Sequence, residues 1–591
     1  MRFAVWSEPR SNEAAGTLRR GGVLTALVYR TREGLRTLSD RERALVILCA
    51  TAITAGALWG ITVSVRATTT VVPAPGGTVR TGIVGQPRFI LPILAQTNDA
   101  DMDLSRLVYS GLLTVTTDGK LEGDLAESVD VSADGKTYTV KLRRNVQWHD
   151  GEPFTAEDVL LTIRLIQDPA VKSPIASRFQ GVTASKDDDF TVRFTLREPY
   201  APFLTTLQTG ILPSHIWSQT PPQGIALAEY VLRPIGTGPF KFEKLKRAEF
   251  SGEVREYQLV RNPTTHGPPP FLDSLQFRFF STTDDLFRAL RQGEIESASF
   301  LPPSLVRDAE RLHEVAVKRL RLPQYFAVFL NQTKHAAFGD LVVRRALTAA
   351  VDRDAIIREA LRGEGVRVDT PIPPGSIGHA PDIATVPFDG EKAKQGLEEA
   401  GWKDADSDGT REKDGTPLRF TLSTTDWPEY VRTAQLLADQ WRAIGADVSV
   451  QPATVGTMQA EILRPRNYEA LLYGEVLGMD PDPYPFWHST QTRDPGVNLA
   501  LFKDREADKL LEEVRKTTDP EKRAALYRKF QERILSEAPA LFLYSPTYAY
   551  TVSKRLGGTF LESGPLPADR FATVGTWYVK TKRVWKGTNR P

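Results

Sequence analysis

The clearest pattern of apolar and polar positions lies between residues 125 and 142. Apolar residues alternate with threonine and lysine from Thr137 to Leu142, and such alternation predicts a strand with one apolar face. The dipeptide Asp134-Gly135 separates this run from an extended run before it. Because Asp-Gly favours the tight turns that join antiparallel strands, the sequence predicts a β-hairpin over these residues.

After this hairpin the pattern becomes helical. Thr155 precedes two acidic residues, Glu157 and Asp158, and this order is typical of a capped helix N-terminus. Apolar residues then recur on one face of the predicted helix, at Val159, Leu160, Ile163 and Ile166. Asp168-Pro169 ends the helix, because proline cannot continue it.

Further strands and helices are predicted along the rest of the chain. Strands are expected at 79–84, 190–197, 418–422 and 446–450, and helices at 104–111, 286–295, 343–351 and around 435–441. The last two strands and the helix between them predict a β-α-β unit. Gly445 marks the end of that helix.

Residues 44–65 form an apolar run without a charged residue, flanked by Arg43 and Arg66. As a helix this run is about 33 Å long, enough to cross a hydrocarbon core of about 30 Å. Nine arginines and no lysine lie in residues 1–43. The positive-inside rule places such a leader in the cytoplasm and the body outside, either periplasmic or at the cell surface. A single-pass membrane anchor is therefore predicted at 44–66.

A cleaved signal peptide is the alternative interpretation of this run. The leader and the apolar stretch are longer than is usual for a signal peptide, and Val65-Arg66-Ala67 is a poor match to the small-x-small pattern of a cleavage site. Cys49 lies early in the run, whereas a lipid-modified cysteine would follow it. The anchor is favoured, and residues 67–77, rich in Thr, Pro and Gly, are expected to form a linker.

The body beyond residue 66 is almost neutral. The chain of 591 residues has a formal net charge of +2, but residues 1–66 hold ten arginines and five acids, which leaves the body at −3. A neutral body argues against nucleic acid as a partner. The length predicts two or more hydrophobic cores, and a single cysteine excludes an intramolecular disulfide.

No signature of a catalytic or cofactor site is present in the sequence. HExxH, GxSxG and Walker A motifs are absent, and no two of the seven histidines are spaced i, i+4. Residues 404–415 resemble a calcium loop at Asp404, Asp406, Asp408 and Gly409, but its twelfth position is Gly415 instead of glutamate. A solvated turn is expected there, and no metal, cofactor or catalysis is expected of this chain.

The residue string at 125–159 is far more specific than its periodicity. LAESVDVSADGKTYTVKLRRNVQWHDGEPFTAEDV closely resembles the signature of the family 5 extracytoplasmic solute-binding proteins, the peptide, nickel and opine receptors of ABC importers. GTGPF at 236–240, the helix at 286–295 and FGDLVVRRALTAAVDR at 338–353 resemble the same family. The resemblance covers about residues 78–591.

The resemblance implies an α/β, two-lobed, periplasmic-binding-protein-like fold of type II, in its large cluster C form, with an extra subdomain and one transmembrane helix before it. Its cleft would close on the ligand by a hinge motion. The implied division is a leader at 1–43, an anchor at 44–66, a linker at 67–77, lobe one at 78–322 with a subdomain at about 112–232, lobe two at 323–545, and a return to lobe one at 546–591.

The resemblance also implies a ligand site between the lobes. The candidate contacts that it places are Thr97, Asn98, Asp99, Tyr325, Asn331, Tyr473, Gly474, Glu475, Asp480 and Trp487. The main chain from Tyr473 to Val476 would pair with an extended ligand, as in strand addition. Asn98 and Asp99 are also explained as helix-initiating residues, and Trp487 as part of the core.

One departure from the family concerns the ligand's amino terminus. Peptide receptors of the family carry an aspartate that pairs with a free α-amine. With Asp482-Pro483 as the anchor of the comparison, that position is Met479 here, and Asp480 is one residue away. Either Asp480 takes the role through a local shift, or the protein does not require a free amine; the second is favoured.

The implied function is extracytoplasmic binding of peptides by a monomer that delivers them to an ABC permease and its ATPase. Other solutes, such as nickel chelates, opines or sugars, are the alternative within the family. A membrane-anchored sensor or adhesion module without a permease is the alternative outside transport. A permease and an ATPase encoded nearby would favour the transport function.

Overall fold

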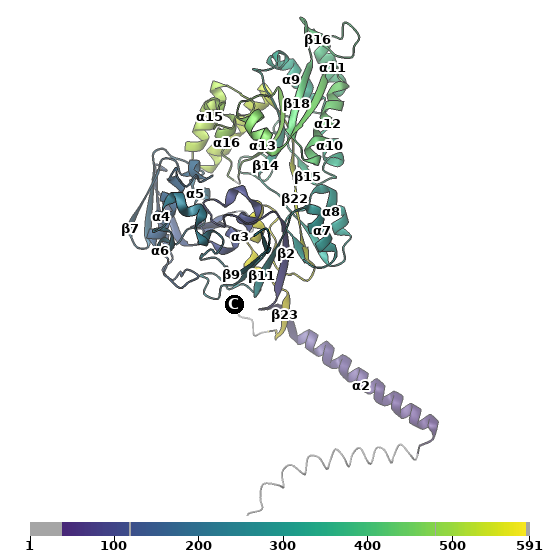
Figure 1. The fold of residues 1–591 in the computed structure, drawn as a ribbon. Helices are drawn as coiled ribbons and strands as arrows, with labels where there is room; N and C mark the ends of the chain where they lie inside the picture. Colours follow the sequence, from purple (N-terminus) through teal and green to yellow (C-terminus); the bar gives the residue numbers. More distant parts are fainter. Residues whose placement is uncertain (1–37, 117–119, 479, 587–591) are drawn as a thin grey trace, which may run out of the picture. The chain divides into compact units, whose positions relative to one another are not determined.

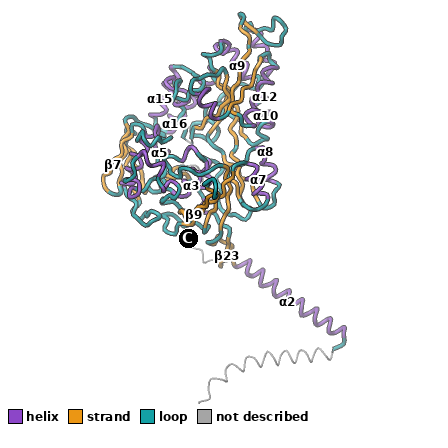
Figure 2. The backbone as a smooth tube through the Cα atoms, viewed as in Figure 1, coloured by secondary structure: helices purple, strands orange, loops and turns teal. Residues whose placement is uncertain are grey.

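The computed structural model describes residues 38–116, 120–478 and 480–586. The chain divides into two units, one containing the residues up to Pro73 and those from Thr581 onward, the other containing Ala74–Lys580. Figure 1 labels the elements, and Figure 2 distinguishes helices, strands and loops. Most of the predicted arginine-rich leader lies outside the described residues.

The first unit contains a long apolar helix, α2 (Asp40–Thr68). An 18-residue window of this helix has a mean hydropathy of 2.1, and none of its residues is buried in the protein. The hydroxyls of Thr51, Thr54 and Thr62 each donate to the carbonyl four residues earlier, so these polar groups are satisfied within the helix. α2 includes the predicted apolar run and is long and apolar enough to cross a membrane.

The segment predicted as a linker contains a strand. Thr69–Ala74 form β1, which pairs with β23 (Lys580–Trp585) in a two-stranded sheet. A paired strand therefore lies within the segment that the sequence predicts as a linker. Its threonines and valines have a high preference for strands, and the partner strand lies near the other end of the sequence, where no local pattern reveals the pairing.

The second unit contains a seven-stranded sheet. In spatial order its strands are β13 (Val315–Leu320), β22 (Tyr548–Ser553), β12 (Ser297–Ala298), β2 (Thr78–Val84), β11 (Ser274–Phe280), β10 (Val254–Arg261) and β9 (Phe240–Arg247). β2 runs parallel to both of its neighbours. Helices α7 (Thr283–Arg291) and α8 (Pro303–Glu310) pack on this sheet through a cluster that includes Leu286 and Val306.

A four-stranded antiparallel sheet shares one hydrophobic core with the seven-stranded sheet. Its order is β5 (Ala126–Val131), β6 (Thr137–Leu142), β8 (Thr191–Leu196) and β7 (Val182–Asp188), and α4 (Ala156–Gln167) packs on it. β5 and β6 are the predicted hairpin, with Gly135 at a φ of +67° in the turn. Thr155 is the N-cap of α4 and forms a capping box with Asp158, which confirms both local predictions.

Six strands form the third large sheet. Their order is β15 (Gly365–Arg367), β21 (Ala540–Pro546), β14 (Gln324–Leu330), β20 (Ala470–Val476), β18 (Arg419–Thr425) and β19 (Asp447–Ala453). One face packs against α9 (Leu341–Ala349), α10 (Arg353–Glu359) and α12 (Pro428–Arg442), and the other against α15 (Arg505–Lys516) and α16 (Pro520–Glu537) (Figure 1). β18 and β19 are parallel and joined by α12, which confirms the predicted β-α-β unit.

The remaining elements are shorter. They include α3 (Asp99–Val108), α5 (Phe203–Thr206), α6 (Ser214–Trp217), α11 (Gly390–Glu399), α13 (Val455–Thr457), α14 (Tyr484–Trp487), β3 (Leu113–Val115), β4 (Leu121–Gly123), β16 (Glu412–Lys413) and β17 (Thr416–Pro417). α3 begins earlier than its apolar pattern predicts. Asn98 is its N-cap and accepts from the Ala100 amide at 2.9 Å, so polar capping sets this boundary.

The chain passes between the seven-stranded and six-stranded sheets at two places. β13 leads into β14 through residues 321–323, and β21 leads into β22 through Thr547. The strands on either side are paired, with Leu320 opposite Tyr548 in one sheet and Phe326 opposite Tyr544 in the other. Two short connections therefore lie side by side.

Candidate functional site

β20 loses its neighbour on one side before it ends. β14 pairs with β20 along its whole length, as far as Gln324 opposite Val476. β18 pairs with β20 only at Leu422–Ala470 and Ser423–Leu471, because the rest of β18 continues beside β19. Beyond Leu471, one edge of β20 has no strand partner among the described residues.

Main-chain groups of Gly474 and Val476 face this gap. The Thr424 hydroxyl donates to the Leu472 carbonyl at 3.2 Å, so that carbonyl points towards β18. Alternate residues of a strand direct their N–H and C=O groups to the same side, which places Gly474 and Val476 in the same set. Within the described residues, neither forms a main-chain hydrogen bond outside the ladder with β14. Such an edge can accept an added strand.

The gap opens at the end of β20 that is nearer to the seven-stranded sheet. Val476 lies opposite Gln324, and Gln324 directly follows the connection from β13. β18, β19 and β20 are parallel, so the loops that follow them leave the sheet at this same end. Ligands bind most often beyond the carboxyl ends of parallel strands.

The predicted ligand contacts Thr97, Asn98 and Asp99 lie at the start of α3. This helix packs in the same hydrophobic core as the seven-stranded sheet. Thr97 and Asp99 have exposed side chains, whereas the Asn98 side chain is engaged as the helix cap and donates to the Gln86 carbonyl at 2.5 Å. The surrounding protein raises the pKa of Asp99, and the Arg570 guanidinium opposes that shift. The Asp99 carboxylate is therefore exposed, although nearby protein atoms raise its pKa.

A buried ion pair holds α3 in place. Arg570 donates to Asp103 with both amino groups, one of them at 2.7 Å, and the two side chains are almost fully buried. The guanidinium lies 4.4 Å from the centre of the Phe571 ring. Burial raises the pKa of Asp103 to about 6, although Arg570 opposes this shift. The pair fixes the helix that carries Asp99 at its first turn.

Tyr325, Glu475 and Trp487 meet inside the six-stranded sheet's core. The Tyr325 hydroxyl donates to Glu475 and accepts from Trp487 Nε1 at 3.2 Å. All three are buried. Burial raises the pKa of Glu475 well above its ordinary value, against the hydrogen bond from Tyr325, so the surroundings disfavour the charged form of this carboxyl.

Two other predicted contacts have structural partners. Asn331 is buried and donates to the Tyr468 carbonyl at 2.8 Å, which ties β14 to the turn before β20. The Tyr473 hydroxyl accepts from Gln459 at 3.2 Å and its side chain is half-buried. The structure thus gathers Tyr473, Gly474 and Glu475 near Tyr325 and Trp487, while Asn331 lies at the far end of β14.

Both aspartates after β20 are paired with arginines. Asp480 contacts Arg523 at 2.7 and 2.9 Å, and both side chains are largely buried. Asp482 accepts from Arg515 at 2.6 Å and from the Tyr200 hydroxyl at 3.1 Å. These partners were not identified from the sequence, since they lie 43, 33 and 282 residues away.

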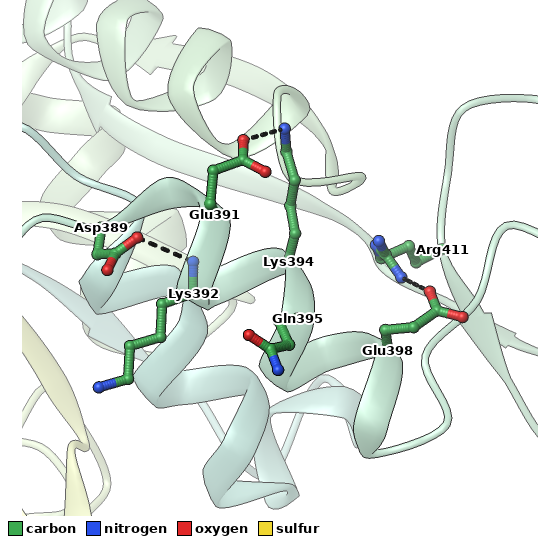
Figure 3. A pocket seen from close by; sticks show the side chains of 7 residues that line it. All are labelled: Asp389, Glu391, Lys392, Lys394, Gln395, Glu398 and Arg411. Atoms are coloured by element: carbon green, nitrogen blue, oxygen red, sulfur yellow. Dashed lines mark hydrogen bonds and ion pairs between the residues drawn. The ribbon is translucent and has the colours of Figure 1, made fainter.

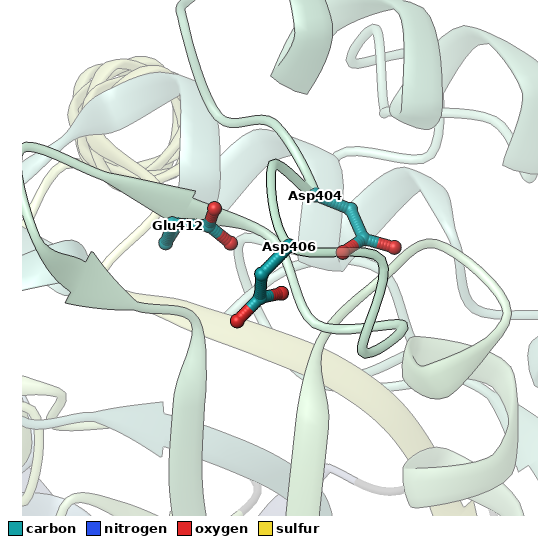
Figure 4. Close-up of side chains that lie close together, drawn as sticks. All are labelled: Asp404, Asp406 and Glu412. Atoms are coloured by element: carbon teal, nitrogen blue, oxygen red, sulfur yellow. The ribbon is translucent and has the colours of Figure 1, made fainter.

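Two groups of charged residues lie near α11, and both are at the protein surface. A surface hollow is lined by charged residues that pair with one another, Glu391 with Lys394 at 2.8 Å and Glu398 with Arg411 at 2.6 Å (Figure 3). Asp404, Asp406 and Glu412 lie close together in the loop tested for calcium (Figure 4). Asp404 accepts from the Gly409 amide at 3.1 Å, as in the expected turn.

Comparisons with known proteins agree with the resemblance of the sequence. The family model described as bacterial extracellular solute-binding proteins, family 5 Middle, matches residues 120–496. The oligopeptide-binding protein AppA of Bacillus subtilis (strain 168) is 29% identical over 494 residues, which cover 82% of this chain and 89% of that protein.

Solved structures match over a similar length. AppA from Bacillus subtilis in complex with a nonapeptide has a TM-score of 0.70 at 28% identity and covers 86% of this chain and 100% of that one. NikZ from Campylobacter jejuni in complex with Ni(L-His) has a TM-score of 0.70 at 26% identity and covers 85% and 99%. The family model alone spans more than half of the sequence. This chain therefore belongs to family 5 of the bacterial extracellular solute-binding proteins.

Proposed function

We propose that this protein binds peptides and delivers them to an ABC permease. Like the other members of its family, it is a binding protein and not an enzyme. The observation that carries the proposal is the unpartnered edge of β20 at Gly474 and Val476. A peptide has matching N–H and C=O groups along its main chain and can add a strand there with little dependence on its side chains.

We propose that the seven-stranded and six-stranded sheets belong to two lobes that close on the ligand. Lobe one comprises 78–322, with a subdomain at about 112–232, and the return segment 546–591; lobe two comprises 323–545. The paired connections at 321–323 and Thr547 form the hinge. Thr97 and Asp99 contact the ligand from lobe one, and Tyr473 and Gly474 from lobe two. Tyr325, Asn331, Glu475 and Trp487 support β20.

The site does not require a free amino terminus. In the family's peptide receptors the ligand ammonium pairs with an aspartate at the position that follows β20, and a carboxylate there must be free of other partners to take this role. Asp480 is held by Arg523 and Asp482 by Arg515. Peptides with a blocked amine are therefore expected to bind as well as free ones.

α2 anchors the protein in the membrane, with the body outside the cytoplasm. This proposal rests on the length and hydropathy of the helix and on the arginines before it. The partners are an ABC permease and its ATPase, and the protein acts as a monomer.

The first test is native mass spectrometry of the full chain released from detergent, followed by calorimetry with defined peptides. Co-purified masses that resolve into a series of peptides are expected. An acetylated peptide and its free-amine form should bind within about threefold of each other. Absence of binding to any peptide mixture would overturn the peptide proposal, and a requirement for the free amine would overturn the amine-independent site.

The edge of β20 is tested by removing one main-chain donor. Val476→Pro lacks the N–H that faces the gap but leaves the bonds to β14, because proline is tolerated where no ladder bond is required. One lost hydrogen bond corresponds to about tenfold weaker peptide binding. Val476→Ala is the matched control, since it shortens the side chain and keeps the donor. Equal affinities of the two variants would contradict strand addition at this edge.

A further inference from the structure

Trp427 is an exposed aromatic residue at the start of α12. It is 49% exposed, although only Asp426 separates it from the largely buried strand β18. As the N-cap of α12 it offers no side-chain oxygen to the helix amides. Capping therefore does not explain a tryptophan at this position.

Trp427 is the outer member of a stack of aromatic rings. Its ring lies 6.2 Å from Tyr430 at an interplanar angle of 23°. Tyr430 lies 4.5 Å from Phe326, and Phe326 lies 5.5 Å from Tyr544. Tyr430 belongs to α12, and Phe326 and Tyr544 belong to strands β14 and β21 of the six-stranded sheet, so the exposed ring packs on a rigid base.

The stack lies over the open edge of β20. A Cβ atom on Gly474 would come within 2.7 Å of the Phe326 ring, so the absence of a side chain lets this ring cover Gly474. Gly474 is one of the two residues whose main chain faces the gap. A strand added beside Gly474 would therefore pass the inner end of the stack.

Neighbouring strand ends add two more exposed apolar side chains. Val455 follows β19 and is 52% exposed; Val476 ends β20 and is 53% exposed. β19, β18 and β20 are adjacent and parallel, and the Asp426 amide donates to the Ala453 carbonyl at 2.9 Å, which keeps the first two loops together. Single exposed apolar residues need no explanation, but three at adjacent strand ends indicate a binding surface.

We propose that Trp427, supported by Tyr430 and Phe326, forms a subsite that selects a bulky apolar side chain of the ligand, with aromatic side chains preferred. The proposal rests on the proposed peptide-binding function and adds a side-chain preference to it. Successive side chains of a strand point to opposite faces, so one residue of the added strand meets the Trp427 ring. Aromatic pairs prefer offset or edge-to-face stacking and gain affinity beyond the area that they bury.

Charge at the site disfavours acidic ligand side chains. Asp426 is exposed, Glu429 is half-buried, and within the described part of the chain neither forms an ion pair. The pKa of Tyr430 is raised first by burial and then by the Glu429 carboxylate, which places that negative charge beside the stack. A glutamate in the ligand at this position would meet like charge.

The test uses the full chain in detergent and acetylated pentapeptide amides of alanine. One residue at a time is replaced by Trp, Leu, Lys or Glu, and affinities are measured by calorimetry. At one position Trp should bind at least tenfold more tightly than Ala, Leu should be intermediate, and Glu weakest. Trp427→Ala should reduce the Trp-to-Ala ratio to about threefold or less, and Trp427→Phe should retain most of it.

Phe250→Ala is the matched control. Phe250 is fully exposed in the turn between β9 and β10, so its removal should leave every ratio unchanged. An unchanged ratio in Trp427→Ala, or tightest binding of the Lys peptide, would overturn the subsite while leaving peptide binding intact. Failure of all peptides to bind the unmodified protein would overturn both the subsite and the proposed function.

Discussion

At the scale of single residues, His149 shows how a sequence motif acts. Its Nδ1 accepts from the Gly236 amide at 3.2 Å, and Nε2 lies 3.0 Å from the Gly238 carbonyl, to which it donates. A neutral imidazole satisfies both bonds, with its proton on Nε2. Burial lowers the pKa of His149 to about 4. The histidine of the family signature thus holds the GTGPF loop and must remain uncharged.

His149 should make the folded protein sensitive to acid. Since its pKa is lower in the folded than in the unfolded state, its contribution is fully present above about pH 6.5 and is lost as the pH falls towards 4. The loss corresponds to about 3 kcal/mol. His149→Asn should remove this dependence, so the difference in unfolding free energy between the two proteins should shrink from pH 7 to pH 4.

Denaturant unfolding at a series of pH values measures this difference. Burial raises the pKa of Asp101 to about 6. The contribution of Asp101 to the stability of the protein therefore changes in the opposite direction and is lost as the pH rises towards 6. Asp101 is present in both proteins and cancels in the comparison. Parallel pH profiles would show that His149 is not the acid-sensitive group.

At the scale of elements, the C-terminal end of α15 contacts the loop that follows β8 of the four-stranded sheet. Through these contacts, residues near the four-stranded sheet meet residues that pack on the six-stranded sheet. Arg515 donates to Asp482 and lies 4.0 Å from the Tyr484 ring centre. Its carbonyl accepts from the Ala201 amide at 2.7 Å, and Tyr200 reaches Asp482. Charge-assisted bidentate bonds of this kind are strong and directional. They connect the segments that the proposed lobe closure brings together.

Loss of the Arg515–Asp482 pair should weaken ligand binding. If these contacts stabilise the closed form, their removal lowers the closed fraction, and the apparent affinity falls by the same factor. Arg515→Met should weaken peptide binding about tenfold, a value expected for breaking a partly buried charge pair. Calorimetry and the radius of gyration from solution scattering measure both effects.

A double variant provides the control for this prediction. Arg515→Met with Asp482→Asn leaves no unpaired carboxylate, so it should bind more tightly than Arg515→Met alone. If Arg515→Met binds like the unmodified protein with an unchanged radius of gyration, the pair has no part in closure.

At the scale of the whole molecule, α2 is the basis of the proposed membrane location. The helix exposes apolar side chains along its length, among them Leu58 and Ile61. An exposed apolar surface of this extent is unfavourable in water. The same apolar surface is favourable in a hydrocarbon layer, and the internal hydrogen bonds of a helix pair its main-chain groups there.

Two charges in α2 should prevent membrane insertion. Each arginine at the centre of a membrane helix costs about 2.5–3.5 kcal/mol, so Leu58→Arg with Ile61→Arg should move the protein out of the carbonate-resistant membrane fraction. Leu58→Ile with Ile61→Leu is the matched control and should remain there. Recovery of the unmodified protein in soluble form, without its first 65 residues, would instead identify a cleaved signal peptide.

Part of the fold and little of the site could be predicted from local patterns. The hairpin at Asp134-Gly135, α4 behind Thr155 and the β18–α12–β19 unit were predicted correctly, because turns, caps and periodicity act within a few residues. β1 was missed, since its partner lies near the other end of the chain. Trp427 was missed because no local signal separates an exposed tryptophan from a core one.

The sequence by itself determined the family and the apolar segment α2, because a motif and a hydropathy profile depend only on consecutive residues. The α/β class followed from the resemblance to the family. Only the tertiary structure decided which groups near β20 are available. It paired Asp480 with Arg523, buried Glu475 against Tyr325, and left the edge of β20 open where β18 turns aside. Availability depends on contacts between distant segments, and these form only when the chain has folded.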